Sequence, residues 1–318
     1  MKITDILEAE KGKKLISFEI LPPVKGKSIE AITKILDPLM EFKPSFIDVT
    51  YHREDYKYKQ TPAGYFEKIS IRKRPGTVGI CAAIKYRYNV EAVPHFLCGG
   101  FSKVETENAL IDLAFLGINN ILALRGDARG MEKKFIPEEN GHGYAVDLVK
   151  QIEGMNSGIY LDDDLVNPVH TDFCIGVAGY PEKHFEAANL EEDLQYLKDK
   201  IDAGGDYIVT QMFFNNEAFF KFVEDCRKIG ITVPIIPGLK AITRKSQLNS
   251  IPSAFYIDLP DALVKELRNA KDDIQAKQIG IEWCIQQSKE LLAYGVPCLH
   301  YYTMGDVKTT SAICSEVV

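Results

Sequence analysis

LISFEI (residues 15–20) and FIDVTY (residues 46–51) are two short apolar runs that flank a stretch with helical periodicity. Runs of this length that are rich in Ile, Val and Phe are typical of buried parallel strands. Ser28 can cap the helix between them, which we expect to end near Met40. A strand, a helix and a second strand form the repeating unit of α/β proteins.

The same unit recurs along the whole chain. Six further runs read as strands: Glu91–Leu97, Asn119–Leu124, Phe173–Tyr180, Asp206–Phe213, Val233–Leu239 and Cys298–Thr303. Glu91–Leu97 is the weakest of them, because Pro94 lies inside it. Eight strand–helix units predict a (β/α)8 TIM-type barrel that forms a single domain over residues 1–318. A doubly wound sheet is the main alternative, but no G-x-G-x-x-G motif follows any run.

Helices are predicted between the strands, and two segments read as insertions. The predicted helices are 28–40, 77–88, 104–116, 144–152, 190–203, 217–229 and 274–294, with a segment at 245–269 broken by Pro252 and Pro260. Ser102 and Glu105 form a capping box before the third of these helices. The insertions, residues 129–141 and 156–172, are expected to be surface loops.

Composition narrows the class of protein. The chain has 318 residues, 46% of them hydrophobic and 26% charged, with a net charge of −7. These are values of a globular domain, and the negative charge argues against sequence-independent nucleic-acid binding. Seven cysteines without a C-x-x-C pair predict buried, reduced thiols and a cytoplasmic location. No apolar stretch is long enough for a membrane span, and the six histidines lack metal-ligand spacing, so we expect neither membrane nor metal.

Polar side chains gather where the predicted strands end. In a barrel these ends meet on one face, and so many polar groups there are costly unless a ligand uses them. The group comprises Glu19, Asp48, Thr50, Tyr51, His95, Arg125, Gly126, Asp127, Tyr180, Thr210, Gln211 and residues 300–303.

Glu19 is the sharpest candidate in this group. It lies between Phe18 and Ile20, and desolvation favours the neutral carboxylic acid that general-acid catalysis needs. A buried glutamate paired with Lys or Arg is the structural alternative.

Ten short blocks make the chain resemble the flavin-dependent 5,10-methylenetetrahydrofolate reductases of the bacterial catalytic-domain type. They occur in the same order as in that family and extend over nearly the whole chain. The blocks are SFEILPP (17–23), DVTY (48–51), PHFLC (94–98), ALRGD (123–127), YAVDLV (144–149), GYPEKHFEA (179–187), DAGGD (202–206), TQMFF (210–214), IIPG (235–238) and HYYT (300–303).

The resemblance implies a barrel that holds FAD at its C-terminal face. Such an enzyme uses NADH or NADPH to reduce methylenetetrahydrofolate for methionine synthesis by ping-pong hydride transfer through FAD. Glu19 would be the general acid, and Asp127 would lie beside flavin and folate. FAD contacts are implied for Thr50, Tyr51, His95, Arg125, Gly126, Asp127, Ala145, Tyr180, His184, Ala187, Asp193 and Lys200. Folate contacts are implied for Gln211 and Gln247.

The resemblance also implies a homo-oligomer. At several positions, however, the sequence differs from the pattern of the family. Asp306 replaces an arginine that meets the folate tail in many members, and Lys308 is a candidate substitute. Tyr196 and Asp199 replace polar or basic residues of the FAD helix, and the pair at residues 52–53, His-Arg, replaces a small pair. No C-terminal regulatory domain that binds adenosylmethionine is expected.

Two other readings compete with a flavin reductase. One is a barrel enzyme that acts on a phosphorylated metabolite without flavin, but Gly238 stands alone where such a phosphate site needs a glycine pair. The other is a non-catalytic barrel, which would have no use for a desolvated acid at Glu19.

Overall fold

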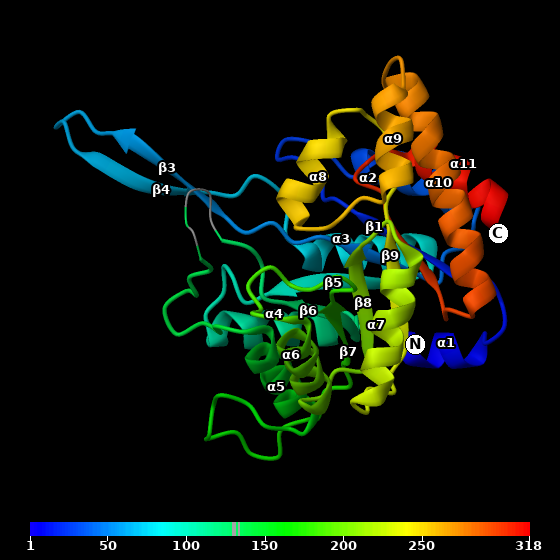
Figure 1. Ribbon diagram of the computed structural model, residues 1–318. Helices are drawn as coiled ribbons and strands as arrows, with labels where there is room; N and C mark the ends of the chain where they lie inside the picture. The colour runs from blue at the N-terminus through cyan, green and yellow to red at the C-terminus, as the bar shows by residue number, and fades with distance from the viewer. Residues whose placement is uncertain (129–131, 133) are drawn as a thin grey trace.

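Eight parallel strands close into a barrel in the computed structural model, which describes residues 1–128, 132 and 134–318 (Figure 1). Around the barrel the strands follow the order β1-β10-β9-β8-β7-β6-β5-β2. Their bounds are β1 Ile16–Ile20, β2 Phe46–Val49, β5 Glu91–Leu97, β6 Asn120–Leu124, β7 Cys174–Gly179, β8 Tyr207–Met212, β9 Ile235–Leu239 and β10 Leu299–Tyr302. The predicted (β/α)8 barrel and all eight predicted strands are therefore confirmed. Pro94 pairs with Val49 inside β5 without interrupting it.

Helices surround the barrel. The larger part of the hydrophobic core lies between these helices and the outer surface of the barrel. The helices are α2 Glu30–Met40, α3 Thr77–Tyr88, α4 Lys103–Phe115, α5 Ala145–Asn156, α6 Leu190–Asp202, α7 Asn216–Lys228, α8 Gln247–Phe255, α9 Asp261–Asn269, α10 Asp273–Tyr294 and α11 Val307–Val317. Outward-facing strand residues such as Phe18 and Ile47 pack in one apolar cluster with helix residues such as Leu36. Burial of this surface is the main stabilising contribution.

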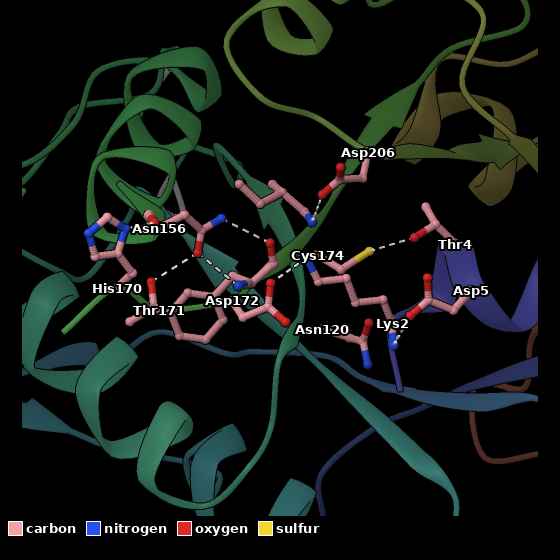
Figure 2. A network of polar contacts seen from close by, with 12 residues as sticks. Lys2, Thr4, Asp5, Asn120, Asn156, His170, Thr171, Asp172, Cys174 and Asp206 are labelled. Atoms are coloured by element: carbon pink, nitrogen blue, oxygen red, sulfur yellow. Dashed lines mark hydrogen bonds and ion pairs between the residues drawn. The ribbon is translucent and has the colours of Figure 1, made fainter. Parts of the chain in front are cut away.

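The N-terminal helix α1 (Ile3–Ala9) closes one end of the barrel. Its Ile3 and Leu7 pack in a second apolar cluster with inward-facing Phe46 and Tyr207. Polar contacts hold this end together in Figure 2, where Thr4 approaches the Cys174 thiol at 3.9 Å. The Ile3 amide also donates to the Asn120 side chain at 2.9 Å. Because these partners stand at strand starts, the opposite, C-terminal end is the one left for a ligand.

The structure corrects several local predictions. Ser28 does not cap α2, because the helix begins two residues later and Ile29 is its cap. Pro252 lies within α8 and does not break the segment, whereas Pro260 caps α9. The capping box of Ser102 and Glu105 is confirmed.

Three elements have no counterpart in the prediction: α1, α11 and a hairpin of β3 (Asp55–Gln60) and β4 (Phe66–Ile71). The hairpin projects from the barrel in Figure 1, and its strands are mostly exposed. The predicted loop at 156–172 is irregular from residue 157 onward, whereas Asn156 is the last residue of α5. Of the predicted loop at 129–141, residues 129–131 and 133 lie outside the described residues. All seven cysteines are buried and free. Within the described part of the chain, no helix could span a membrane.

Candidate active site

Glu19 lies near the C-terminal end of β1, where it contacts one group after the adjacent strand β2 and one on β5, the next strand around the barrel. Its Oε1 accepts a hydrogen bond of 2.9 Å from the Thr50 hydroxyl, just after β2. Its Oε2 lies 3.4 Å from Nε2 of His95, on β5. Only 9% of Glu19 is exposed. The structural alternative of a Glu19–Lys or Glu19–Arg pair is not found among the described residues, because its ion-pair partner is a histidine.

Asp48 of β2 is the fourth member of this group, after Glu19, Thr50 and His95. It pairs in register with Glu19, and its Oδ2 lies 3.6 Å from the same Nε2 of His95. Burial lowers the pKa of His95, but the nearby Glu19 and Asp48 outweigh burial and leave that pKa raised. An imidazolium between two carboxylates is therefore the favoured state of His95.

A second group of predicted residues surrounds the end of β7 and the start of α6. The Tyr180 ring lies 4.7 Å from the His184 ring in an edge-on arrangement. Asp193 accepts a 3.0 Å hydrogen bond from the His184 amide, which fixes the loop against α6. Ala187 is buried in this loop and its carbonyl accepts from Lys183 at 2.6 Å.

Lys200 brings a cation into the same group. Its ammonium donates to the Ala178 carbonyl at 2.6 Å, and no acidic side chain of the described residues forms an ion pair with it. Burial lowers the pKa of Lys200 to about 8, although Asp193 opposes the shift. A buried ammonium without a carboxylate partner is a ready site for an anionic ligand.

The segment after β6 supplies Arg125, Gly126 and Asp127. Arg125 pairs with Glu186 and lies over the Phe135 ring, 5.4 Å from its centre. Gly126 has a φ of +86°, a conformation that favours glycine. The backbone carbonyl of Asp127 accepts a 2.6 Å hydrogen bond from Arg53. Asp127 as a whole is exposed at the rim of the barrel. The Asp127 carboxylate thus remains available to a ligand.

Of the two residues predicted to contact folate, Gln211 lies on β8, next to its final residue Met212, and Gln247 is the first residue of α8, after β9. Gln247 accepts from the Thr243 and Arg244 amides, so its carbonyl oxygen holds the loop before α8. It also lines a cavity of about 240 Å³ together with Lys240, Tyr302 and Asp306. Gln211 accepts from the amide of Met212 at 2.9 Å. A larger hollow of about 490 Å³ between α8 and α9 contains none of the predicted site residues.

Two predicted residues stand apart from these groups. Tyr51 packs against Phe101 with ring centres 5.1 Å apart, and burial raises its pKa. Ala145 is the first residue of α5. The described contacts connect neither of them to Glu19 or Lys200.

The sequence did not single out Lys240, which the structure places at the end of β9 and beside the cavity. Burial lowers the pKa of its amine, and none of the described residues forms an ion pair with it. Its position directly after an apolar run was the available signal. Asp48 was recognised as a strand-end residue, but its proximity to His95 could not be read from the sequence.

The departures from the family pattern have structural partners of their own. Asp306 caps α11 and pairs with Lys277 at 3.2 Å. Tyr196 donates to Glu192, and Asp199 accepts from Gln195, both on α6. These contacts leave Asp306 in a structural role.

A family model described as methylenetetrahydrofolate reductase matches residues 2–318. The chain is 34% identical over 98% of its length to "Methylenetetrahydrofolate reductase (NADH) 1" of Arabidopsis thaliana, of which the match covers 50%. It is 30% identical over 95% of its length to "5,10-methylenetetrahydrofolate reductase" of Pectobacterium carotovorum subsp. carotovorum, of which the match covers 90%. The chain thus spans about half the length of its plant relative.

A solved structure supports the fold. It is described as "Uncharacterized protein from Clostridium thermocellum binds two copies of 5-methyl-5,6,7,8-tetrahydrofolic acid" and superposes with a TM-score of 0.57. The superposition covers 98% of this chain and 97% of that one, with 17% sequence identity. At this identity the likeness speaks for a shared fold alone.

Proposed function

The chain belongs to the methylenetetrahydrofolate reductase family, and from that premise we propose that it reduces 5,10-methylenetetrahydrofolate to 5-methyltetrahydrofolate in the cytoplasm. The electrons come from NADH or NADPH and pass through FAD in a ping-pong cycle, and the product supplies methyl groups for methionine synthesis. The observation that carries the proposal is the buried Glu19 at the open end of the barrel, with its oxygens on Thr50 and His95.

The residues around β6, β7 and α6 suit FAD. Its pyrophosphate needs cations and its ring needs aromatic and hydrogen-bonding neighbours. Lys200 offers a buried ammonium without a carboxylate partner, and Arg125 offers a guanidinium that Glu186 holds in place. Tyr180 and His184 offer the aromatic surface. When bound there, FAD would accept a hydride from the nicotinamide and deliver it to the folate.

The remaining chemistry belongs to the protein. Glu19 protonates the ring nitrogen of the folate, so that the five-membered ring opens to an iminium that can take the hydride. Thr50 holds the Glu19 carboxyl group in place through its hydroxyl. Asp127, exposed at the rim, holds the pterin by accepting its N–H groups.

Flavin binding and reduction test this proposal. The purified protein should carry or take up FAD, and the oxidised-flavin absorbance should bleach when NADH or NADPH is added without oxygen. Titration with each nicotinamide separately also shows which one the protein prefers. A protein that takes up no FAD would exclude the reductase function.

FAD affinity should fall as pH rises above about 8. Lys200 begins to lose its proton there in the free protein, whereas a bound pyrophosphate stabilises the ammonium and keeps it charged. Binding must then take up a proton, so the dissociation constant should rise by up to roughly tenfold per pH unit. The measurement is quenching of flavin fluorescence over a pH series.

Two variants give this test its controls. Lys200→Met should bind FAD more weakly at neutral pH and lose most of the pH dependence. Lys198→Met removes a lysine from the same helix that pairs with Asp202 instead, and should keep the wild-type dependence. If Lys200→Met retained the full pH dependence, another group would be the titrating cation.

A further inference from the structure

Asp48 is a fully buried carboxyl group with neither oxygen in a hydrogen bond to any described residue. Its nearest cationic partner is His95, at 3.6 Å, and His95 Nε2 also lacks a hydrogen bond of good geometry. Such groups are rare in folded proteins, because a buried carboxylate whose oxygens accept no hydrogen bond has lost its water without full compensation. A purely structural polar pair would be expected to satisfy these oxygens.

The other side chains around Asp48 do not compensate its charge. The titratable groups that face Asp48, Glu19 or His95 are Tyr207 on β8, Lys240 after β9, Cys298 just before β10, His300 and Tyr302 on β10, Cys81 on α3 and His52 after β2. Burial lowers the pKa of His300 and of His52, which favours their neutral forms. No Lys or Arg of the described residues lies within ion-pair distance of either carboxylate.

Charge balance then determines how many protons the group holds. With both carboxylates ionised and His95 protonated, the three side chains carry a net charge of −1 in a buried site. A net charge that is buried away from water is penalised by desolvation. One additional proton makes the group neutral.

We infer that Glu19, Asp48 and His95 act as one proton-sharing unit, in which Asp48 is a positioning residue that makes the unit retain the proton Glu19 delivers. This inference rests on the proposed reductase function and extends it. Asp48 has no access to a ligand, so it acts only through its charge on Glu19 and His95. Glu19, which Thr50 holds toward the open end, is the member that reaches the substrate.

The proton transfers of the unit balance. As Glu19 protonates the folate nitrogen, its O–H bond breaks and an N–H bond forms on the substrate, which leaves Glu19 ionised. The proton on Nε2 of His95 then passes over the 3.4 Å separation to Oε2 of Glu19. His95 becomes neutral and regains a proton from water that enters the open end of the barrel when the product leaves.

Opposite charge changes should move the pH profile of folate reduction in opposite directions. In Asp48→Asn the Glu19–His95 pair is neutral without the additional proton and does not retain it. Activity should therefore be lost at a pH about one unit or more below that at which the wild type loses it. His95→Gln leaves two carboxylates without a cation, so the loss should move to higher pH by a similar amount. Ser17→Ala, a neutral change that removes a hydrogen bond to His300 in the barrel interior, should not move the profile.

A structural role for Asp48 would give a different result. It would lower the rate at every pH without moving the profile, or move both charge variants in the same direction. Either outcome would overturn the inference.

A proton count on the FAD-free protein separates this inference from the reductase function. In a difference titration near neutral pH, the wild type should bind about one proton more than Asp48→Asn. Equal proton counts would overturn the inference even if the protein reduces folate. If the counts differ but folate is not reduced, the proton-sharing unit stands and the proposed reaction fails. Far-ultraviolet circular dichroism and thermal unfolding confirm that each variant is folded before it is compared.

Discussion

Glu19→Gln should abolish folate reduction by a factor of roughly 10² or more while the protein still oxidises NADH or NADPH. The amide keeps the shape of the carboxyl group and can still accept from Thr50, but it has no acidic proton to give. Flavin reduction by the nicotinamide needs no such proton from Glu19. The two half-reactions, followed separately by flavin absorbance in a stopped-flow instrument, should therefore respond very differently.

Glu182 offers a matched control for this experiment. It lies after β7, is half-buried, and accepts a 2.8 Å hydrogen bond from the Asp258 amide. Burial raises its pKa to about 7, so it is a second carboxyl group able to hold a proton near neutral pH. Glu182→Gln should leave the folate half-reaction within about twofold of the wild type. Equal losses in both half-reactions of Glu19→Gln would make Glu19 a structural residue instead.

Asp127→Asn should slow the folate half-reaction by roughly 10- to 100-fold, with a much smaller effect on FAD binding. A hydrogen bond to a charged group contributes about 1.5–3 kcal/mol, and loss of that amount corresponds to this range of rates. FAD should remain bound because the Asp127 carbonyl, which accepts from Arg53, is kept in the variant. Flavin absorbance of the purified variant and its rate of flavin reoxidation by folate provide the measurement.

The amount of FAD bound to purified Asp127→Asn shows whether Asp127 acts at the cofactor or at the folate. If Asp127→Asn were purified without FAD and failed to bind added FAD, Asp127 would belong to the cofactor site. A slow folate step in a variant that is fully loaded with FAD would support its proposed role at the pterin.

The barrel could be predicted because each strand leaves a clear local pattern. β1 and β2 are short apolar runs with a helix between them, and this unit repeats around the chain. The β3–β4 hairpin left no such apolar run, because its strands are mostly exposed. Helix α1 is short, and its role in closing the barrel depends on contacts with the distant Asn120 and Cys174.

The candidate site could be predicted at the level of strand ends, but not at the level of contacts. Glu19 and His95 are both visible as polar residues in apolar runs, yet they are brought to within 3.4 Å only by closure of the barrel. The hydrogen bonds that occupy individual side chains could not be predicted either. The side-chain oxygen of Gln247, for example, accepts a hydrogen bond from the Thr243 amide in the preceding loop. The resemblance to a known family supplied the roles that residue types alone leave open.

Anaerobic reoxidation of the reduced flavin by methylenetetrahydrofolate is the decisive test of the proposed reductase reaction. The protein is loaded with FAD, the flavin is reduced with an equimolar amount of NADH or NADPH, and methylenetetrahydrofolate is then added. We expect the oxidised-flavin absorbance to return and 5-methyltetrahydrofolate to form in an amount equal to the flavin. In Glu19→Gln both events should be slower by the factor given above. A flavin that stays reduced in the wild type after folate is added would contradict the proposed reaction.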